Sequence, residues 1–284
     1  MRIEVNNLTK KYGSKLALDA VSFILEEPKI YGLLGRNGAG KTTFMEILAG
    51  QIIASSGDIL IDGENSFDNQ RLTESICLIK EGDNFKKDLS VKNVLKVSSY
   101  FYPNWDERLA HDLAKEYNLD IKAKVKALSK GMESALGIIV GLASKAPITV
   151  FDEPYIGLDA AARKKFYDIL LREYEKEPRI IIFSTHLIDE VSLMFEEVLI
   201  LQDGKLALQE DADILRNRAC AVSGTIQQVE EFIKDKEVIT TKKLAGMMTA
   251  YIFGHMEEAE MTGLSTEGVP IQDLMIYLTE NKGA

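Results

Sequence analysis

The spacing of apolar residues alternates between two patterns along most of the chain. Short, nearly uninterrupted apolar runs are typical of parallel strands that are buried on both faces. Longer stretches between them have apolar residues at helical spacing. The apolar runs lie at residues 29–34, 148–151, 180–183 and 198–201, and the helical stretches at residues 41–49 and 160–176. This alternation predicts an α/β fold in which helices cover both faces of a mostly parallel sheet.

Two segments depart from this alternation. Residues 88–145 are helix-like with almost no strand signal, which predicts an inserted helical subdomain. After residue 205 the strand–helix rhythm weakens, although residues 270–279 again have helical spacing. We therefore expect a main domain of residues 1–210 and a small α+β domain of residues 211–284.

Composition narrows the class of protein. The 284 residues are 46% hydrophobic and 27% charged, and the formal net charge is −10. The longest apolar run, counting glycine, has nine residues, 135–143, whereas a membrane-spanning helix needs about 20, so we expect no direct membrane insertion. The acidic balance argues against nucleic acid as the main ligand. The N-terminus has no secretory pattern, and two cysteines form no disulfide framework, which favours a cytoplasmic protein.

A glycine-rich segment follows the first apolar run. Residues 35–42, GRNGAGKT, match the pattern G-x-x-x-x-G-K-[ST] at every fixed position. Glycines let backbone N–H groups curl around phosphate oxygens, and the following helix N-terminus adds partial positive charge. Lys41 is expected to pair the β- and γ-phosphates, and the Thr42 hydroxyl to bind Mg²⁺. The alternative is a plain glycine-rich turn. The candidate phosphate-site residues are Gly35, Asn37, Gly38, Ala39, Gly40, Lys41, Thr42 and Thr43.

The second half of such a site is a strand that ends in carboxylates. Residues 148–151 are followed by Asp152 and Glu153. Ligands of open α/β sheets collect at the carboxyl ends of strands. Asp152 is therefore expected to hold Mg²⁺ through water, and Glu153 to act as general base on an attacking water. By itself this segment also suits a turn that starts a helix.

With these residues in hand, the chain resembles the ATP-binding subunits of ABC transporters over residues 1–210. Residues 128–132, LSKGM, resemble the signature segment of that family, and residues 157–159, GLD, resemble its D-loop. His186 resembles the switch histidine, and Tyr12 the aromatic residue that stacks on adenine. Each also has a simpler interpretation. The signature segment suits a helix cap, Tyr12 suits the core or surface, and His186 suits the first turn of a helix over 187–195 capped by Ser184 or Thr185.

The resemblance implies a fold and a mechanism. The fold is a P-loop NTPase core with N-terminal antiparallel strands and a helical subdomain. Two copies, or this chain and a related ATPase subunit, face each other head to tail. MgATP held by one copy is then covered by Ser129 and Gly131 of the other, and Asp159 communicates across the interface. Glu153, His186 and Lys41 are the implied catalytic residues. Integral membrane transporter subunits are the implied partners, on the cytoplasmic face of the membrane.

The sequence also departs from the family pattern. Glu81 stands where the family normally has a glutamine, and Lys130 and Met132 replace a glycine and a glutamine of the signature. Glu81 is expected to bind Mg²⁺ together with Thr42 and Asp152, and to slow turnover through its charge. The alternative is a surface carboxylate in a loop. These departures, with the aromatic residues of segment 100–105, resemble one branch of the family, the ATPases of bacitracin- and lantibiotic-type export systems.

Three functions are therefore open. The leading hypothesis is an ATPase that drives export through membrane subunits. The second is a nucleotide-gated regulatory or binding module with little turnover, which Glu81 would permit. The third is an ABC protein that acts on ribosomes or DNA. A single phosphate loop and the negative charge disfavour the third.

Overall fold

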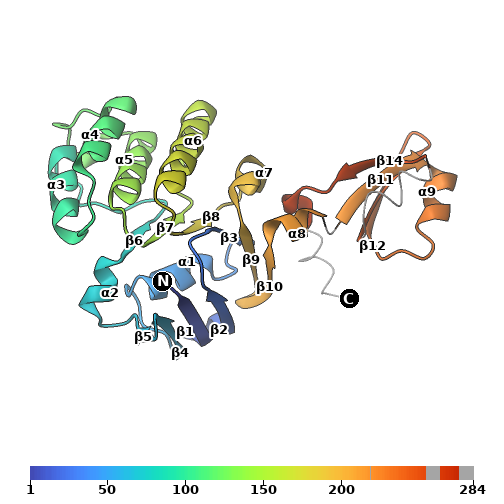
Figure 1. Ribbon diagram of the computed structural model, residues 1–284, viewed down its shortest axis with the longest axis horizontal. Helices are drawn as coiled ribbons and strands as arrows, with labels where there is room; N and C mark the ends of the chain where they lie inside the picture. The colour runs from blue at the N-terminus through green and yellow to red at the C-terminus, as the bar shows by residue number, and fades with distance from the viewer. Residues whose placement is uncertain (218, 254–262, 275–284) are drawn as a thin grey trace. The chain divides into compact units, whose positions relative to one another are not determined.

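A computed structural model describes residues 1–217, 219–253 and 263–274 (Figure 1). Contacts divide the chain into two compact units. The first unit comprises residues 1–186 and 201–206, and the second comprises residues 187–200 and 207–284. The expected boundary between a main domain of residues 1–210 and a small domain of residues 211–284 stays a prediction. No helix among the described residues has the length and apolar character needed to cross a membrane.

A parallel sheet forms the centre of the first unit. Its strands β3 (Ile30–Leu34), β8 (Ile180–Ser184), β7 (Ile148–Asp152) and β6 (Ile76–Ile79) pair in that order, and all three pairings are parallel. Every residue of β3, β7 and β8 is buried. Burial on both faces explains why these strands are continuous apolar runs. The parallel sheet predicted from the sequence is therefore confirmed.

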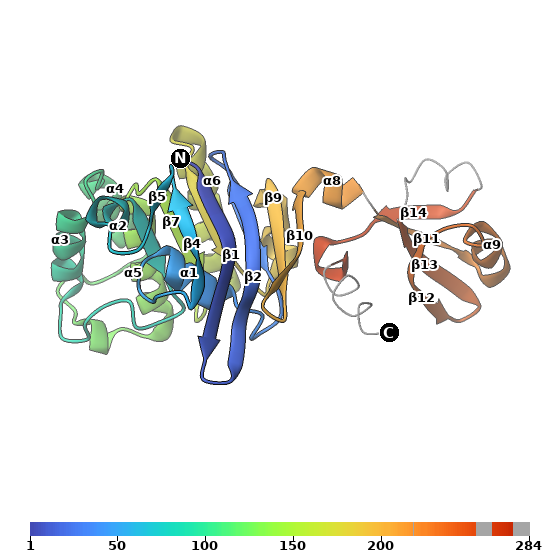
Figure 2. The same ribbon diagram turned by 90° about the horizontal axis from the view of Figure 1, so that it is seen from below.

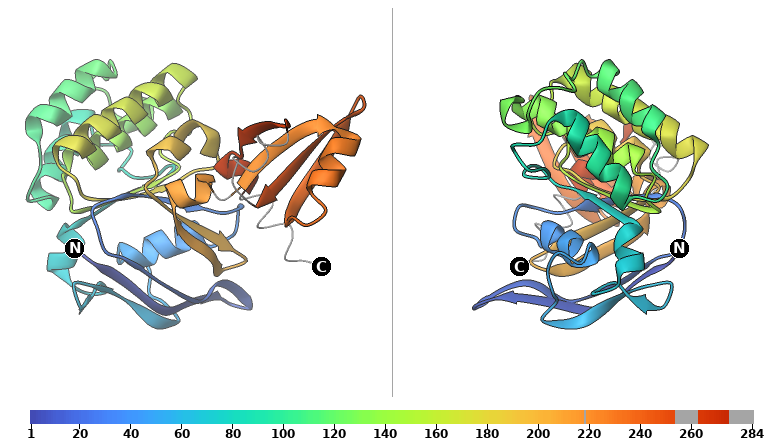
Figure 3. Two further views of the ribbon diagram at one scale, coloured as in Figure 1. Left: turned by 45° about the vertical axis from the view of Figure 1, so that its right-hand side comes forward. Right: turned by 90° about the vertical axis from the view of Figure 1, so that its left-hand side faces the viewer.

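Helices cover both faces of this sheet (Figures 1 and 3). Helix α1 (Lys41–Leu48) contacts β7 on one face and β2 of the N-terminal sheet below it, where Phe23 and Phe44 meet edge to face at 5.2 Å. Helices α5 (Lys130–Ala143) and α6 (Ala160–Lys176) lie on the other face. The Phe151 ring of β7 packs against Phe166 of α6 at 5.5 Å. Successive side chains of β7 thus reach opposite helical layers.

The N-terminal residues form an antiparallel sheet, visible in Figure 2. Strands β2 (Lys15–Leu25), β1 (Ile3–Tyr12), β4 (Ser56–Ile61) and β5 (Glu64–Asn65) pair in that order. The long β1–β2 hairpin carries Tyr12 and Lys15 at its tip, paired with each other. The antiparallel sheet implied by the family resemblance is confirmed.

The chain between β6 and β7 is helical. It contains α3 (Val91–Phe101), α4 (Glu107–Glu116), the short 3₁₀ helix η1 (Val125–Ala127) and α5, while α2 (Gln70–Glu74) precedes β6. Ser90, Asp106 and Ser129 cap the N-termini of α3, α4 and α5, each accepting a hydrogen bond from the backbone three residues later. Tyr100 and Phe101 are mostly exposed at the end of α3. These two aromatic side chains therefore do not form a packed core of the subdomain.

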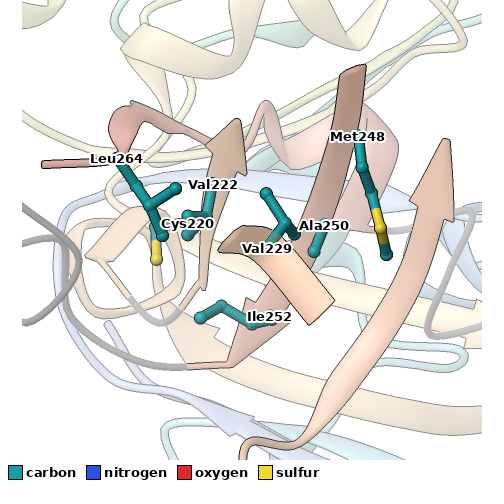
Figure 4. Close-up of a cluster of buried hydrophobic side chains, with 7 residues drawn as sticks. All are labelled: Cys220, Val222, Val229, Met248, Ala250, Ile252 and Leu264. Carbon is teal, nitrogen blue, oxygen red and sulfur yellow. The ribbon is translucent and has the colours of Figure 1, made fainter. Parts of the chain in front are cut away.

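The second unit ends in a small α+β domain, as the sequence predicts. Strands β12 (Val238–Leu244), β13 (Met247–Phe253), β11 (Ala219–Thr225) and β14 (Ser265–Gly268) form an antiparallel sheet in that order. Helix α9 (Ile226–Phe232) begins with a capping box between Thr225 and Gln228. The core of this small domain, drawn in Figure 4, consists of Cys220, Val222, Val229, Met248, Ala250, Ile252 and Leu264.

The remaining elements of this unit precede that sheet. They are α7 (Ile188–Val191), the 3₁₀ helix η2 (Ser192–Met194) and α8 (Ala212–Asn217). Strands β9 (Glu197–Gln202) and β10 (Lys205–Asp211) have residues in both units. Of the helix expected over 270–279, residues 275–279 lie outside the described residues.

Candidate functional site

The glycine-rich loop joins the carboxyl end of β3 to the N-terminus of α1. Gly35, Gly38 and Gly40 have φ angles of +150°, +85° and +106°. L-residues with a side chain rarely adopt this left-handed region. A Cβ at position 40 would also lie 2.5 Å from the Ala17 carbonyl oxygen. Glycine is therefore required at position 40 by both the turn and its packing, and the loop curls ahead of a helix N-terminus that favours anions.

Lys41 is the buried cation of this loop. Only 7% of its surface is exposed, and its Nζ donates a 2.8 Å hydrogen bond to the Gly35 carbonyl. Burial lowers the pKa of Lys41, while the charges of Glu153 and Asp152 act in the opposite direction. A cation with so little water around it interacts strongly with an anion. The loop therefore has the donors and the charge that a phosphate group needs.

Two oxygen ligands meet beside Lys41. Asp152, which is 6% exposed, accepts hydrogen bonds of 2.6 Å from Thr42 at Oδ2 and from Ser184 at Oδ1. These contacts fix the carboxylate at the end of β7. Hard oxygen donors suit Mg²⁺, which commonly takes one or two protein ligands and completes its shell with phosphates and water. Within the described residues, no three His, Cys, Asp or Glu side chains converge as a metal site. Thr42 and Asp152 therefore fit Mg²⁺ only together with a phosphorylated ligand.

Glu153 and His186 form a second pair at the same edge of the sheet. Glu153 Oε2 lies 2.7 Å from His186 Nδ1. Glu153 has a φ of +50°, a left-handed conformation that residues with a side chain adopt uncommonly. The alternative in which Ser184 or Thr185 caps a helix after His186 is wrong, because α7 has no side-chain cap. The Ser184 hydroxyl donates to Asp152 instead, and Thr185 is hydrogen-bonded to Tyr155.

A cavity of about 640 Å³ joins these groups. Of the predicted site residues, it brings together Tyr12, Asn37, Gly38, Gly40, Lys41, Thr42, Thr43, Glu81, Asp152, Glu153 and His186. Gly35 and Ala39 belong to the loop but do not line the cavity, and Ser129, Gly131 and Asp159 lie outside it. The sequence analysis missed Lys15, Ala17 and Ile156, which also line it. The position of Lys15 directly across the hairpin tip from Tyr12 is the one signal that points to it.

Tyr12 stands at the rim of this cavity. Its side chain is 48% exposed, and the Lys10 ammonium lies 5.0 Å from its ring centroid. Cation–π contact of this kind orders an exposed ring. A half-exposed aromatic ring beside a phosphate-binding loop suits stacking on a planar base.

The segment at the start of α5 is tied to the turn before α6. Ser129 caps α5 by accepting the Met132 N–H at 3.2 Å, and Asp159 caps α6. A Cβ at Gly131 would lie 2.5 Å from the Gly157 carbonyl oxygen. Within the chain, Ser129 therefore acts as the helix cap that the simpler interpretation predicts. Its hydroxyl oxygen lies at the N-terminus of the long helix α5.

Glu81 lies between two cavities. Its Oε1 is 3.1 Å from the Lys130 Nζ, and both side chains are more than half exposed. Glu81 lines the large cavity, and together with Lys130 it also lines a second cavity of about 450 Å³. An exposed ion pair of this kind is weak, about 0–1 kcal/mol, so the carboxylate exchanges partners easily.

Comparison with known proteins identifies the class of protein that this site defines. Residues 18–156 match the family described as ABC transporter. The bacitracin transport ATP-binding protein BcrA of Bacillus licheniformis is 33% identical over 76% of this chain and 72% of its own length. The lantibiotic transport ATP-binding protein SrtF of Streptococcus pyogenes is 30% identical over 74% of this chain and 91% of its own.

Solved structures agree on the fold. An ATP-binding subunit of an ABC transporter has a TM-score of 0.69 and 24% identity, and covers 76% of this chain and 92% of its own. A dimeric bacterial ABC transporter cassette has a TM-score of 0.64 and 24% identity, and the match covers 74% of this chain and 98% of the cassette.

The chain is therefore an ABC transporter ATP-binding subunit. It binds ATP and is an ATPase whose hydrolysis is coupled to transport.

Proposed function

We propose that Lys41, Asp152, Glu153 and His186 hydrolyse MgATP in one shared cavity. The observation that carries this proposal is the Glu153–His186 pair, with 2.7 Å between Oε2 and Nδ1, in the cavity that Lys41 and Asp152 also line. Glu153 Oε2 accepts a hydrogen bond from the His186 Nδ1–H. This contact orients the carboxylate, which polarises an attacking water. His186 lies next to the γ-phosphate and aligns the attacking water.

The loop around Lys41 holds the phosphates. When ATP binds, the Lys41 Nζ donates to phosphate oxygens in place of the Gly35 carbonyl. The backbone N–H groups at the start of α1 add further donors. Thr42 and Asp152 would hold Mg²⁺, and the ion would supply positive charge against the phosphates. Tyr12 stacks on adenine, and Asn37, Gly38 and Thr43 complete the cradle.

We further propose that the site is completed by a second ATPase subunit, oriented head to tail. Ser129, Gly131 and Asp159 do not line the cavity that Lys41 lines. They lie instead at the N-termini of α5 and α6, where backbone donors favour an anion. These residues therefore reach nucleotide only when it is held by another copy of this chain or by a related subunit.

The subunit would act on partner membrane proteins at the cytoplasmic face. Relatives whose names refer to bacitracin and lantibiotic transport support a role in transport, and we propose that its direction is export. A multi-spanning membrane protein that co-purifies with the chain would support this assignment. A chain that purifies instead with ribosomes or DNA would contradict it.

The glutamate at position 153 provides the decisive test. Glu153→Gln keeps the shape of the side chain but removes its charge, so phosphate release should fall by about a hundredfold or more. ATP should then accumulate in a stable dimer, detected by size-exclusion chromatography with light scattering. Glu175→Gln, an exposed change on α6, is the matched control. Turnover that survives Glu153→Gln would falsify the general-base assignment.

The second function, a nucleotide-gated module with little turnover, is favoured by one observation. Glu81 adds a carboxylate to a cavity that already contains Asp152 and Glu153. Extra negative charge opposes a triphosphate. Under this alternative, the wild-type protein hydrolyses ATP slowly, and its phosphate release exceeds that of Glu153→Gln only slightly, although both bind ATP.

A further inference from the structure

Tyr155 lies in the turn that follows the Asp152–Glu153 pair. Its side chain is 2% exposed, and its ring stacks on Phe183 of β8 with a centroid distance of 6.3 Å and an interplanar angle of 16°. The turn is closed by a 2.9 Å hydrogen bond from the Leu158 N–H to the Tyr155 carbonyl. The ring is thus fixed against the strand that ends just before His186.

The Tyr155 hydroxyl meets His186 at two atoms. It accepts the His186 backbone N–H at 3.1 Å and lies 3.3 Å from the imidazole Nδ1. It is also 2.7 Å from the Thr185 hydroxyl. A buried hydroxyl has one proton to donate and two lone pairs that accept. Three contacts of this hydroxyl are therefore directed at two consecutive residues, Thr185 and His186.

The proton positions follow from the neighbours. A carboxylate only accepts hydrogen bonds, so the 2.7 Å contact between Glu153 and His186 requires the imidazole proton on Nδ1. Because Nδ1 carries a proton and cannot accept, the Tyr155 hydroxyl can donate to the Thr185 oxygen, 2.7 Å away. The tyrosine oxygen holds the backbone of His186 and flanks its ring. These contacts leave Nε2 as the lone-pair nitrogen of the imidazole.

We propose that Tyr155 is a positioning residue that holds the His186 ring with Nδ1–H against Glu153. The proposal rests on the function proposed above for the Glu153–His186 pair. Without the hydroxyl, the backbone N–H of His186 loses its acceptor and the ring is free to turn away from Glu153. Tyr155 thus touches no substrate and acts through His186.

Tyr155→Phe is the appropriate variant, because it removes the hydroxyl and keeps the ring on Phe183. Tyr167→Phe is the matched control, since Tyr167 is also buried and contacts the same Phe183 ring, at 6.4 Å. Melting temperatures of both variants establish that each is folded. We expect kcat to fall by about tenfold in Tyr155→Phe with KM for ATP changed less than about twofold, and Tyr167→Phe to match wild type.

A double-mutant cycle separates positioning from a general structural effect. If Tyr155 acts through His186, Tyr155→Phe lowers kcat in wild type but not in the His186→Ala background. An equal loss of kcat in both backgrounds overturns the proposal.

Imidazole ¹⁵N chemical shifts give a readout that needs no turnover. The chain has three histidines, and His186→Ala assigns the His186 signals. We expect the Nδ1–H tautomer of His186 in wild type, and a mixture of tautomers in Tyr155→Phe, with His111 unchanged as the internal reference. Identical His186 shifts in the two proteins overturn the proposal. A changed tautomer together with full activity of His186→Ala keeps the positioning role and refutes instead the proposed role of His186 in hydrolysis.

Discussion

A buried carboxylate on α6 makes the stability of the first unit depend on pH. Glu173 is 3% exposed, and its two oxygens accept hydrogen bonds from Lys176 at 2.7 Å and Lys145 at 3.0 Å. Burial alone would raise the pKa of Glu173. The hydrogen bonds and charges of the two lysines outweigh burial and lower the pKa from 4.5 to about 2.

The magnitude follows from this pKa. Because the pKa is lower in the folded state, the charged form stabilises the fold, and the contribution is fully present above the unfolded value of 4.5. A shift to a folded pKa of about 2 corresponds to about 3 kcal/mol of the free energy of unfolding at pH 7. This contribution is lost as the pH falls through the folded pKa, and about half of it is already gone near pH 3.

Glu173→Gln tests this reasoning. We expect the free energy of unfolding to fall by about 3 kcal/mol at pH 7, since the buried Lys145 loses its nearer carboxylate and keeps only the exposed Glu177, at 3.6 Å. Urea unfolding followed by the fluorescence of Trp105, the one tryptophan of the chain and a residue of the first unit, measures this value. Glu175→Gln, an exposed change on the same helix, should cost less than about 0.5 kcal/mol. Equal stability of the two variants, or a difference that does not shrink at pH 3, would refute the reasoning.

Three further variants test other parts of the molecule. Glu81→Gln should raise ATP turnover by about fivefold and alter its Mg²⁺ dependence, because a negative charge leaves the cavity; steady-state kinetics identical to wild type would remove Glu81 from the site. Gly141→Ala would bring a Cβ within 2.5 Å of the Phe151 ring, so thermal unfolding should show a loss of about 1–3 kcal/mol in the free energy of unfolding. Gly82→Ala is the control, because its Cβ would meet open space and should leave stability unchanged. Met248→Ala should destabilise the sheet of the second unit by about 2–5 kcal/mol, and unchanged amide hydrogen exchange in β11 and β13 would contradict this.

The parallel sheet and phosphate loop were predictable because each depends on local pattern. Strands buried on both faces are continuous apolar runs, and the loop requires glycine and lysine at fixed positions. The hairpin of β1 and β2 was not predictable from periodicity. Register shifts occur between Val5 and Leu8 and again before Lys11, so the alternation of buried and exposed residues is broken. Only the family resemblance pointed to it.

The contacts around the catalytic residues were also beyond sequence reasoning. The simpler interpretation of His186 had Ser184 or Thr185 as a helix cap, but the pairing of Ser184 opposite Asp152 in the sheet register directs its hydroxyl to that carboxylate. The interactions of Tyr155 depend on how a turn orients one ring toward the end of a neighbouring strand. Neither is encoded in spacing along the chain, because both join residues about 30 positions apart.

The contact between Gly131 and Gly157 has a mechanical consequence. The two backbones touch with no room for a methyl group, and Ser134 adds a hydrogen bond of 2.5 Å to the Ile156 carbonyl. Because of these contacts, we expect a displacement at the beginning of α5 to move the turn before α6 as well. Any lineage that enlarges one of these glycines must reshape the other segment at the same time.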